Sequence, residues 1–531
     1  MSTSSLYESV LAVVGANPAL AATRPPRASA SVVLWRRREG AGLEVYWVRR
    51  SEALAFMGGW HAFPGGALAK SDAAARLLGE PRAQEPGPAA MPESLSEGYQ
   101  PPESLLPGLA ACALRELLEE TGVLPVAGSV AGLAGRLAAA REALLEGDAS
   151  LGEALSAQGL EADASRLVLA GRWLTPPLGP VRFDNRFFLL EWPAEAPIQP
   201  QVIPGELASG EWVEPGAAYR RWQRGEVITA PPILHLLKVL AQDGPEAGLP
   251  RLLDPAEANL GPYRRIEFRP HVVQLPLKTF TLPPATHTNA YFVGRDELVL
   301  VDPGSADPAE VARLEQAVAA LAREGRRVSA IWLTHHHPDH IGGVPLLVER
   351  LGLPVAAHAE TAARLGRQGI AVTRLLEDGQ VVELAGDPPY RLRVLHTPGH
   401  ARGHLCFLAE ETGSLLTGDM ISTVSTIVVD PPEGDMDDYL ASLSKLLEVG
   451  AQTAFPSHGP PAARARQKLQ EFIDHRLWRE EKLLEAWATG ARSHAELRAA
   501  AYEDTPPIAY PLAERQIEAH LQRLRRAGRI S

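Results

Sequence analysis

Four histidines and one aspartate lie within six positions of the segment LTHHHPDHIGG. They are His335, His336, His337, Asp339 and His340. Read as H-x-H-x-D-H at the end of an expected strand, His335 and His337 point the same way, while Asp339 and His340 turn toward a neighbouring position. Imidazoles with one carboxylate are the ligand set that Zn²⁺ prefers, with Mn²⁺ and Fe²⁺ as alternatives. A solvated loop does not explain so dense a group, and we predict a metal site.

Three further ligand candidates follow later expected strands. They are His400 in HTPGHARGH, Asp419 in LLTGDM and His458 in FPSHG. Two cations about 3.5–4 Å apart lower the pKa of a shared water toward neutrality, and the hydroxide attacks a carbonyl carbon or a phosphorus. The chain has no GxSxG segment that would indicate a serine nucleophile instead.

The segments LVDPG, HHHPDH, HTPGH, TGD and SHG, in this order, resemble the metallo-β-lactamase superfamily over about residues 266–465. The resemblance implies two Zn²⁺ (or Mn²⁺ or Fe²⁺). It assigns His335, His337 and His400 to one metal, Asp339, His340 and His458 to the second, and Asp419 to a bridge, with Asp339 also counted as catalytic. It implies that Asp302 orients a ligand, that His336 is a spacer, and that His396 and His404 support the site or contact substrate. The superfamily includes thioesterases, phosphodiesterases, nucleases and lactamases, so the substrate stays open.

A second group of chemical residues lies in ALRELLEETGV, residues 113–123. Glu116, Glu119 and Glu120 are spaced i, i+3 and i+4, so they project from one face of an expected helix. Crowded carboxylates repel each other, and a hard divalent cation such as Mg²⁺ or Mn²⁺ relieves that repulsion. Arg115 is placed to orient a glutamate or to meet a phosphate. The alternative is a solvated acidic helix face.

FPGG at residues 63–66, followed by RELLEETGV, resembles the Nudix box G-x5-E-x7-R-E-U-x-E-E-x-G-U. Arg115, Glu116, Glu119, Glu120 and Gly122 match its second half, and Gly66 matches its first glycine. Two features depart from the pattern, because Asp72 replaces a glutamate and 42 residues rather than seven separate Asp72 from Arg115. The coenzyme A diphosphatase branch carries a similar insertion, and VRFDNRFFLLEW at 181–192 also resembles that branch. The resemblance covers about residues 28–242.

The Nudix resemblance implies Mg²⁺- or Mn²⁺-dependent hydrolysis of a nucleoside diphosphate linked to another group, with coenzyme A derivatives as candidates. Glu116, Glu119 and Glu120 would hold metal and position water, and Arg115, Glu119 and Glu120 would be catalytic. Glu206 or Glu211 would supply a further ligand or base, and the sequence does not choose between them. A retained fold with weakened chemistry is the alternative.

The C-terminal residues form a third, helical region. HRLWREEKLLEAW predicts an amphipathic helix with Leu477, Trp478 and Leu484 inward, and LAERQIEAHLQRLRRAGRIS resembles the last helix of a winged helix. With TLPPATHTNAYFVG at 281–294, this arrangement resembles the β-lactamase-like protein 2 family, which is associated with endoribonuclease activity on single strands. The basic end formed by Arg523, Arg525, Arg526 and Arg529 has three interpretations: a solvated helix end, a nucleic-acid contact, or assembly and gating.

The elements that position these residues indicate a multidomain α/β protein. We predict an N-terminal arm (1–25), a Nudix α/β/α sandwich (26–242), a linker (243–265), a metallo-β-lactamase αββα sandwich (266–465) and a small all-α winged-helix-like domain (466–531). A length of 531 residues agrees with roughly three to four domains. No apolar run is long enough for a transmembrane helix. Only two cysteines, Cys112 and Cys406, exclude a disulfide framework, and we expect a cytoplasmic protein.

Three functions remain open at this point. The first is a two-site metal hydrolase of small, phosphorylated metabolites, because a coenzyme A thioester contains both a pyrophosphate and a thioester. The second is a nucleic-acid hydrolase on single-stranded RNA, for which a net charge of −12 requires a local basic patch. The third, a scaffold without catalysis, is disfavoured because both ligand sets are complete. The sequence does not predict the oligomeric state.

Overall fold

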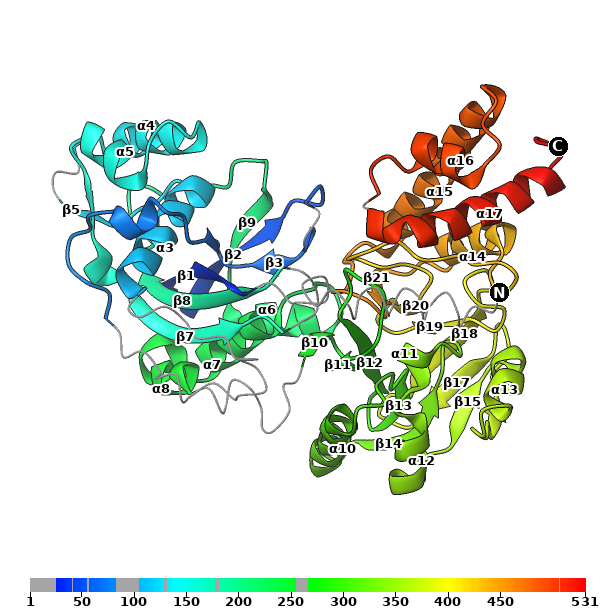
Figure 1. Ribbon diagram of the computed structural model, residues 1–531. Coiled ribbons are helices and arrows are strands. Elements are labelled where there is room, and N and C mark those ends of the chain that lie inside the picture. The colour runs from blue at the N-terminus through cyan, green and yellow to red at the C-terminus, as the bar shows by residue number, and fades with distance from the viewer. Residues whose placement is uncertain are drawn as a thin grey trace. The chain divides into compact units, whose positions relative to one another are not determined.

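The computed structural model describes residues 25–40, 42–54, 57–82, 105–127, 131–176, 181–254, 266–505 and 507–531. They form an N-terminal unit, ending at Pro270, and a C-terminal unit, His271–Ser531 (Figure 1). The predicted N-terminal arm, apart from residue 25, and residues 255–265 of the predicted linker lie outside the described residues. The boundaries predicted for the domains stay predictions.

A mixed sheet is the centre of the N-terminal unit. Its strands run in the order β3-β2-β1-β8-β7, with β4 also beside β1 and β9 beside β2. The strands are β1 Arg27–Arg38, β2 Gly42–Arg50, β3 His61–Ala62, β4 Gly65–Ala67, β7 Val168–Leu174, β8 Phe183–Glu191 and β9 Leu207–Val213, while β5 Val126–Ala127 pairs with β6 Glu161–Ala162, and β10 is Ile266–Arg269. The helices are α3 Leu106–Thr121, α4 Leu133–Leu145, α5 Leu151–Ala157, α6 Pro215–Gln223, α7 Pro231–Ala247 and α8 Leu249–Leu253, with short 3₁₀ turns at Asp72–Ala74 and Ala164–Arg166.

Both faces of this sheet are buried, because apolar residues follow one another along β1. Val32 and Leu34 belong to the core that α3, α4 and α5 cover, whereas Val33 and Trp35 belong to the core under α6 and α7. Successive side chains of a strand point to opposite faces, so one apolar run serves both cores. Helices therefore cover both faces of the sheet (Figure 1).

Helix α3 presents the carboxylates that the sequence placed on one helical face. It begins at Leu106, with Pro107 in its first turn, and it ends at Gly122, which has the left-handed conformation (φ 72°) that glycine adopts without strain. Leu114, Leu117 and Leu118 are fully buried and anchor the opposite side.

Two sheets form the C-terminal unit. The first runs from β11 to β16 in sequence order, and the second runs in the order β17-β18-β19-β20-β21. The strands are β11 Val272–Lys278, β12 His287–Gly294, β13 Glu297–Val301, β14 Arg327–Trp332, β15 Val355–Ala357, β16 Arg374–Leu375, β17 Val381–Leu384, β18 Tyr390–His396, β19 Leu405–Ala409, β20 Ser414–Gly418 and β21 Thr453–Pro456. The helices are α10 Pro308–Arg323, α11 Pro338–Ile341, α12 Val344–Leu351, α13 Ala359–Gly366, α14 Met436–Glu448, α15 Ala465–Ala488, α16 His494–Ala501 and α17 Tyr510–Arg526, with a 3₁₀ turn at Pro507–Ala509.

The two sheets pack face to face, with helices outside. Trp332 of β14 and Phe407 of β19 meet with ring centroids 5.1 Å apart between the sheets. The neighbours of Phe407, Cys406 and Leu408, point to the other side and share a core with Leu443 of α14. On the first sheet, α10 packs against β14. This is the predicted αββα order. It arises because successive side chains of one strand face the other sheet and the covering helices in turn.

The C-terminal region is helical, as the sequence predicted, and the described part of residues 466–531 contains no strand. The winged-helix assignment therefore stays a prediction. The inward positions predicted for two α15 residues are wrong, because Leu477 is 44% and Trp478 is 42% exposed. The inner face instead carries buried Arg476, Arg479 and Glu480 between the apolar residues Ile473 and Leu483. Over the described ranges, no helix has the length and hydropathy needed to cross a membrane.

Candidate functional site

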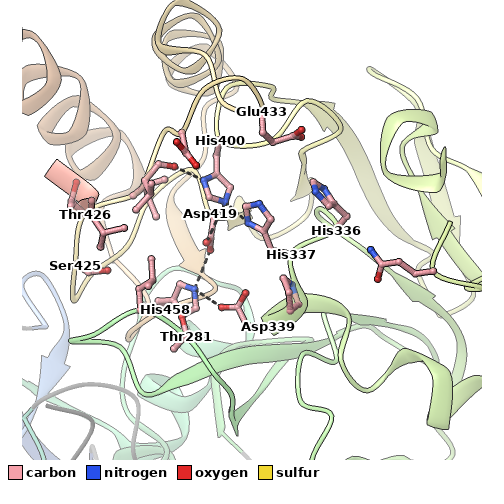
Figure 2. A pocket seen from close by; sticks show the side chains of 17 residues that line it. Thr281, His336, His337, Asp339, His400, Asp419, Ser425, Thr426, Glu433 and His458 are labelled. Atoms are coloured by element: carbon pink, nitrogen blue, oxygen red, sulfur yellow. Dashed lines mark hydrogen bonds and ion pairs between the residues drawn. The ribbon is translucent and has the colours of Figure 1, made fainter. Parts of the chain in front are cut away.

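The ligand candidates of the C-terminal unit meet because each follows a strand. Strands β13, β14 and β15 are parallel, so Asp302, after β13, and His335, after β14, lie at the same edge. His400, Asp419 and His458 follow β18, β20 and β21 of the second sheet. Figure 2 shows His337, Asp339, His400, Asp419 and His458 pointing toward one another in one pocket.

Three imidazoles form the first group. Nδ1 of His337 lies 3.0 Å from Nε2 of His335 and 3.0 Å from Nε2 of His400. The distal nitrogens of two of these rings are already hydrogen-bonded. His400 donates from Nδ1 to the Val428 carbonyl (2.7 Å), and Nδ1 of His335 contacts the Thr334 hydroxyl (2.9 Å). The lone pairs of Nε2 therefore face the centre of the group.

Asp339, His340 and His458 form the second group, and Asp419 lies between the two. Its Oδ2 is 3.7 Å from Nε2 of His400, whereas its Oδ1 is 3.6 Å from Nε2 of His340 and 3.4 Å from Nε2 of His458. Nε2 of His458 is also 3.6 Å from Oδ2 of Asp339. One carboxylate therefore turns one oxygen toward each group.

Supporting residues fix these ligands. Asp302, which adopts φ 49°, accepts from His340 Nδ1 (2.8 Å) and from the Thr334 hydroxyl. His404 Nε2 accepts from the Asp419 backbone N–H (3.1 Å). A Cβ on Gly418 would lie 2.5 Å from that nitrogen of His404, so glycine is required there. His396 instead contacts the Arg402 carbonyl outside the cluster.

The charges of the two groups differ. Burial and the neighbouring imidazoles hold the pKa values of His335 and His337 well below the usual range, so these rings stay neutral. Burial also opposes the charge of His340, but Asp419, Asp339 and Asp302 together raise its pKa well above the usual range. Neutral imidazoles donate lone pairs to metals, and a group with excess carboxylate attracts a cation.

The residues fit divalent metal. Among the described residues, His335 with His337 and His400, and Asp339 with His340 and His458, offer ligand atoms that lie within 4.8 Å of one another. Two atoms that face the centre, Nε2 of His340 and Oδ1 of Asp419, are buried without a hydrogen-bond partner. Buried polar atoms without partners are costly, and a cation between the groups would satisfy both.

A cavity of about 320 Å³ opens onto this cluster. Its wall includes Leu282, Ile427, Val428 and Leu512, with Asp430 and Glu433 beside them. Ile427, Val428, Asp430 and Glu433 were not predicted as site residues, since their spacing follows no motif. His336, predicted to be a spacer, also lines the cavity.

The sequence profile of the metallo-beta-lactamase superfamily matches residues 283–458. An atrochrysone carboxyl ACP thioesterase of Aspergillus fumigatus is 34% identical over 233 residues, which are 41% of this chain and 69% of that protein. A beta-lactamase-like protein 2 homolog of Drosophila melanogaster is 30% identical over 46% of this chain and 84% of that protein. The chain belongs to the metallo-beta-lactamase superfamily.

As a member of the metallo-beta-lactamase superfamily the protein is a hydrolase, as predicted. The profile ends at His458, so it spans the ligand candidates from His335 onward and leaves the N-terminal unit and the terminal helices unmatched. The chain is also similar to a crystal structure of a NUDIX hydrolase from Alicyclobacillus acidocaldarius, at 31% identity and a TM-score of 0.33, covering 41% of this chain and 93% of that one.

The N-terminal unit of this superfamily member brings a second set of predicted residues together. Arg115 of α3 binds Asp72 through Nε (2.9 Å) and Nη2 (3.0 Å), and its Nη1 lies 2.9 Å from Glu116 and 3.0 Å from Glu119. Glu120 accepts from the Gly65 backbone N–H (2.9 Å). Asp72 stands where the Nudix pattern has a longer glutamate, and it precedes Arg115 by 43 residues. It nevertheless binds this arginine.

Burial and mutual repulsion make these carboxylates hard to ionise. Burial raises the pKa of Glu116 to about 7 and that of Glu120 to about 8, and charge repulsion from neighbouring carboxylates adds to the effect. Glu206 contributes to the raised pKa values of Glu119 and Glu120. Glu211 instead accepts from Trp47 and Arg221. Glu206 thus interacts electrostatically with the glutamates of α3, whereas Glu211 is engaged by Trp47 and Arg221.

Proposed function

We propose that the C-terminal unit hydrolyses an ester or thioester of a small molecule at a dinuclear metal centre. The position of Asp419, with one oxygen toward each ligand group, supports this proposal. His335, His337 and His400 would hold one cation, and Asp339, His340 and His458 the other, with Zn²⁺, Mn²⁺ or Fe²⁺ as the metals. When bound, such a pair activates water and polarises the electrophile. Asp302 and the Val428 carbonyl accept hydrogen bonds from His340 and His400 and so keep these rings oriented, and Asp339 would hold a proton of the attacking water.

The lining of the cavity favours an uncharged electrophile. None of the described residues that line it is a lysine or arginine, and leucine, isoleucine and valine side chains form part of its wall. Its carboxylates Asp430 and Glu433 are paired with Arg515 and Arg364. A phosphodiester strand requires cationic contacts, whereas an acyl chain requires an apolar wall. The name of the Aspergillus fumigatus relative, a thioesterase, agrees with the acyl alternative.

We propose a second, Nudix-type activity for the N-terminal unit: hydrolysis of a nucleoside diphosphate linked to another group, with coenzyme A derivatives as candidates. The convergence of Glu116, Glu119 and Glu120 around Arg115 supports it. These glutamates would hold Mg²⁺ or Mn²⁺, which binds phosphate oxygens. Arg115 would orient Glu119 and Glu116, which it contacts, and the Gly65 N–H would hold Glu120.

Two further predictions belong to this proposal. The free, buried Cys112 and Cys406 agree with a reducing compartment, and we propose a cytoplasmic location. Single-stranded RNA stays the alternative substrate. The ion pairs of the terminal arginines weigh against RNA, because Arg523 lies 2.9 Å from Asp437 and Arg526 lies 2.7 Å from Asp435.

A substrate panel on the whole protein tests both activities. It includes acyl thioesters, simple esters, coenzyme A and a single-stranded RNA, and it compares wild type with Asp419→Asn and Glu119→Gln. We expect thioester or ester turnover to disappear in Asp419→Asn only, and release of 3′,5′-ADP from coenzyme A with Mg²⁺ to disappear in Glu119→Gln only. Turnover that persists in both variants, or is lost equally in both, would contradict the assignment of one activity to each unit.

A further inference from the structure

The terminal helices pack directly on the hydrolase. Helices α15 and α17 lie on α14 (Figure 1). Their apolar residues share one core with the second sheet: Ala465, Leu469, Phe472 and Ile473 come from α15, and Ala519 comes from α17. The helices are therefore continuous with the fold that positions the ligands.

Residues 425–433, which we call the strap, form one wall of the cavity. Ser425, Thr426, Ile427, Val428, Asp430 and Glu433 all line it. The strap has neither helical nor strand structure, so backbone ladders do not hold it in place. Its Val428 carbonyl accepts the hydrogen bond of His400 Nδ1 at 2.7 Å. The position of the strap therefore sets the orientation of a proposed metal ligand.

Two buried polar residues of the terminal helices hold the strap. Arg476 of α15 is 2% exposed, and its Nη2 donates to the Ile427 carbonyl and to the Thr426 hydroxyl (3.0 Å). Gln516 of α17 is 3% exposed, and its Nε2 donates to the same carbonyl at 2.6 Å. The next carbonyl along the chain is that of Val428. Two helices thus fix one peptide, and its neighbour orients His400.

Helix α17 makes two more contacts with this wall. Arg515 donates through Nη2 to Asp430 (3.1 Å) and to the Pro431 carbonyl (3.3 Å). Leu512, one turn earlier, lines the cavity itself. The Arg515 side chain is partly buried, with 28% of its surface exposed. The partners of these donors lie on the strap.

We propose that α15 and α17 are part of the hydrolase site, and that Arg476 and Gln516 are positioning residues that hold the strap so that Val428 fixes the ring of His400. The proposal rests on the metal centre proposed above. It gives the terminal helices a role in building the site, in place of a role in holding a nucleic-acid strand.

The test compares Arg476→Gln with Arg479→Gln in the full chain. Arg479 is a matched control, because it is also buried (5% exposed), lies one turn away on α15, and directs its donors to Asp504 and the Ala501 carbonyl. Zn²⁺ affinity is measured by competition with a chromophoric chelator, hydrogen exchange of residues 425–433 by mass spectrometry, and kcat and KM with a chromogenic acyl thioester. We expect Arg476→Gln to weaken Zn²⁺ binding about 10- to 100-fold, as loss of a residue supporting a ligand does, and to speed exchange in the strap.

Arg479→Gln should leave both readings near wild type, and Arg476→Lys should restore part of the Zn²⁺ affinity. Equal Zn²⁺ affinity in the two glutamine variants would overturn the proposal. If Arg476→Gln does not fold, Gln516→Leu removes the second donor with little change in volume and must give the same direction of change. A wild type that binds Zn²⁺ but cleaves no thioester would contradict the proposed substrate, and the affinity and exchange results would still decide the role of Arg476.

Discussion

Asp419 and Arg115 each lie at the middle of a cluster of ionisable side chains. The carboxylate of Asp419 faces His400 on one side and His340 and His458 on the other, while the guanidinium of Arg115 contacts Asp72, Glu116 and Glu119. Burial makes both clusters sensitive to the loss of a partner, because a buried charge without its partner is poorly screened. Small changes beside either residue should therefore have large effects on chemistry.

Gly66 offers such a change in the N-terminal unit. A Cβ at this position would lie 2.2 Å from Oε1 of Glu116, which is the far end of a flexible side chain that also contacts Arg115. Gly66→Ala should therefore lower the melting temperature little, yet displace the Glu116 carboxylate and reduce Mg²⁺-dependent diphosphatase activity at least about tenfold, as loss of a ligand position does. Steady-state kinetics and thermal unfolding measure the two effects.

Gly152→Ala is the control, because a Cβ in that turn of α5 meets nothing within 4 Å. It should leave both activity and melting temperature close to wild type. Full diphosphatase activity in Gly66→Ala would show that Glu116 is not needed as a ligand.

At the scale of one element, the acidic face of α3 predicts a pH-dependent stability. Burial raises the pKa of Glu116 to about 7 and of Glu120 to about 8, above their unfolded values near 4.5. Between about pH 4.5 and about pH 8, the folded metal-free unit therefore binds more protons than the unfolded chain. Its free energy of unfolding falls as the pH rises over this range. Mg²⁺ or Mn²⁺ binds the ionised form, so its stabilisation should grow over the same window.

Thermal unfolding with chelator and with excess Mg²⁺, at about pH 5 and about pH 8, measures this effect. Glu120→Gln removes one titrating group and should flatten the pH dependence in chelator. A melting temperature that rises with pH in chelator, with no added effect of Mg²⁺, would contradict the metal role of α3.

The sequence predicted elements best where the pattern is local. Helix α3, its end at Gly122, and the ligand-bearing loops after β14, β18 and β20 were all predicted, because spacing and turn residues lie within one segment. The strap was not predicted, because its partners Arg476 and Gln516 lie about 50 and 90 residues further along the chain and follow no motif. Trp478 was misplaced because the buried face of α15 runs through Phe472, Arg476 and Leu483 and leaves Trp478 beside it, 42% exposed.

At the scale of the whole molecule, two clusters with different ligand chemistry occur in one chain. The N-terminal cluster offers oxygens only, which suits Mg²⁺ or Mn²⁺, whereas the C-terminal cluster offers mostly imidazole nitrogens, which suits Zn²⁺. Different metals allow both sites to be occupied together without competing for one ion. This agrees with two independent hydrolytic activities. Binding of nucleic acid is the property that separates the two substrate classes proposed for the C-terminal unit, small molecules and single-stranded RNA.

Charge predicts weak binding of single-stranded RNA by the whole protein. The net charge is −12, and two of the four arginines of the basic end, Arg526 and Arg523, are paired with Asp435 and Asp437. Fluorescence anisotropy with a labelled single strand at physiological salt should give a Kd no tighter than about 10⁻⁴ M, the weak limit of non-specific binding. Replacing both aspartates by asparagine frees the two arginines and should strengthen binding and steepen its salt dependence. RNA would instead be favoured as the substrate if wild type bound it tightly and salt-sensitively and lost this binding when the charges of Arg525 and Arg526 were removed. The strand would then have to reach the cavity beside Leu512.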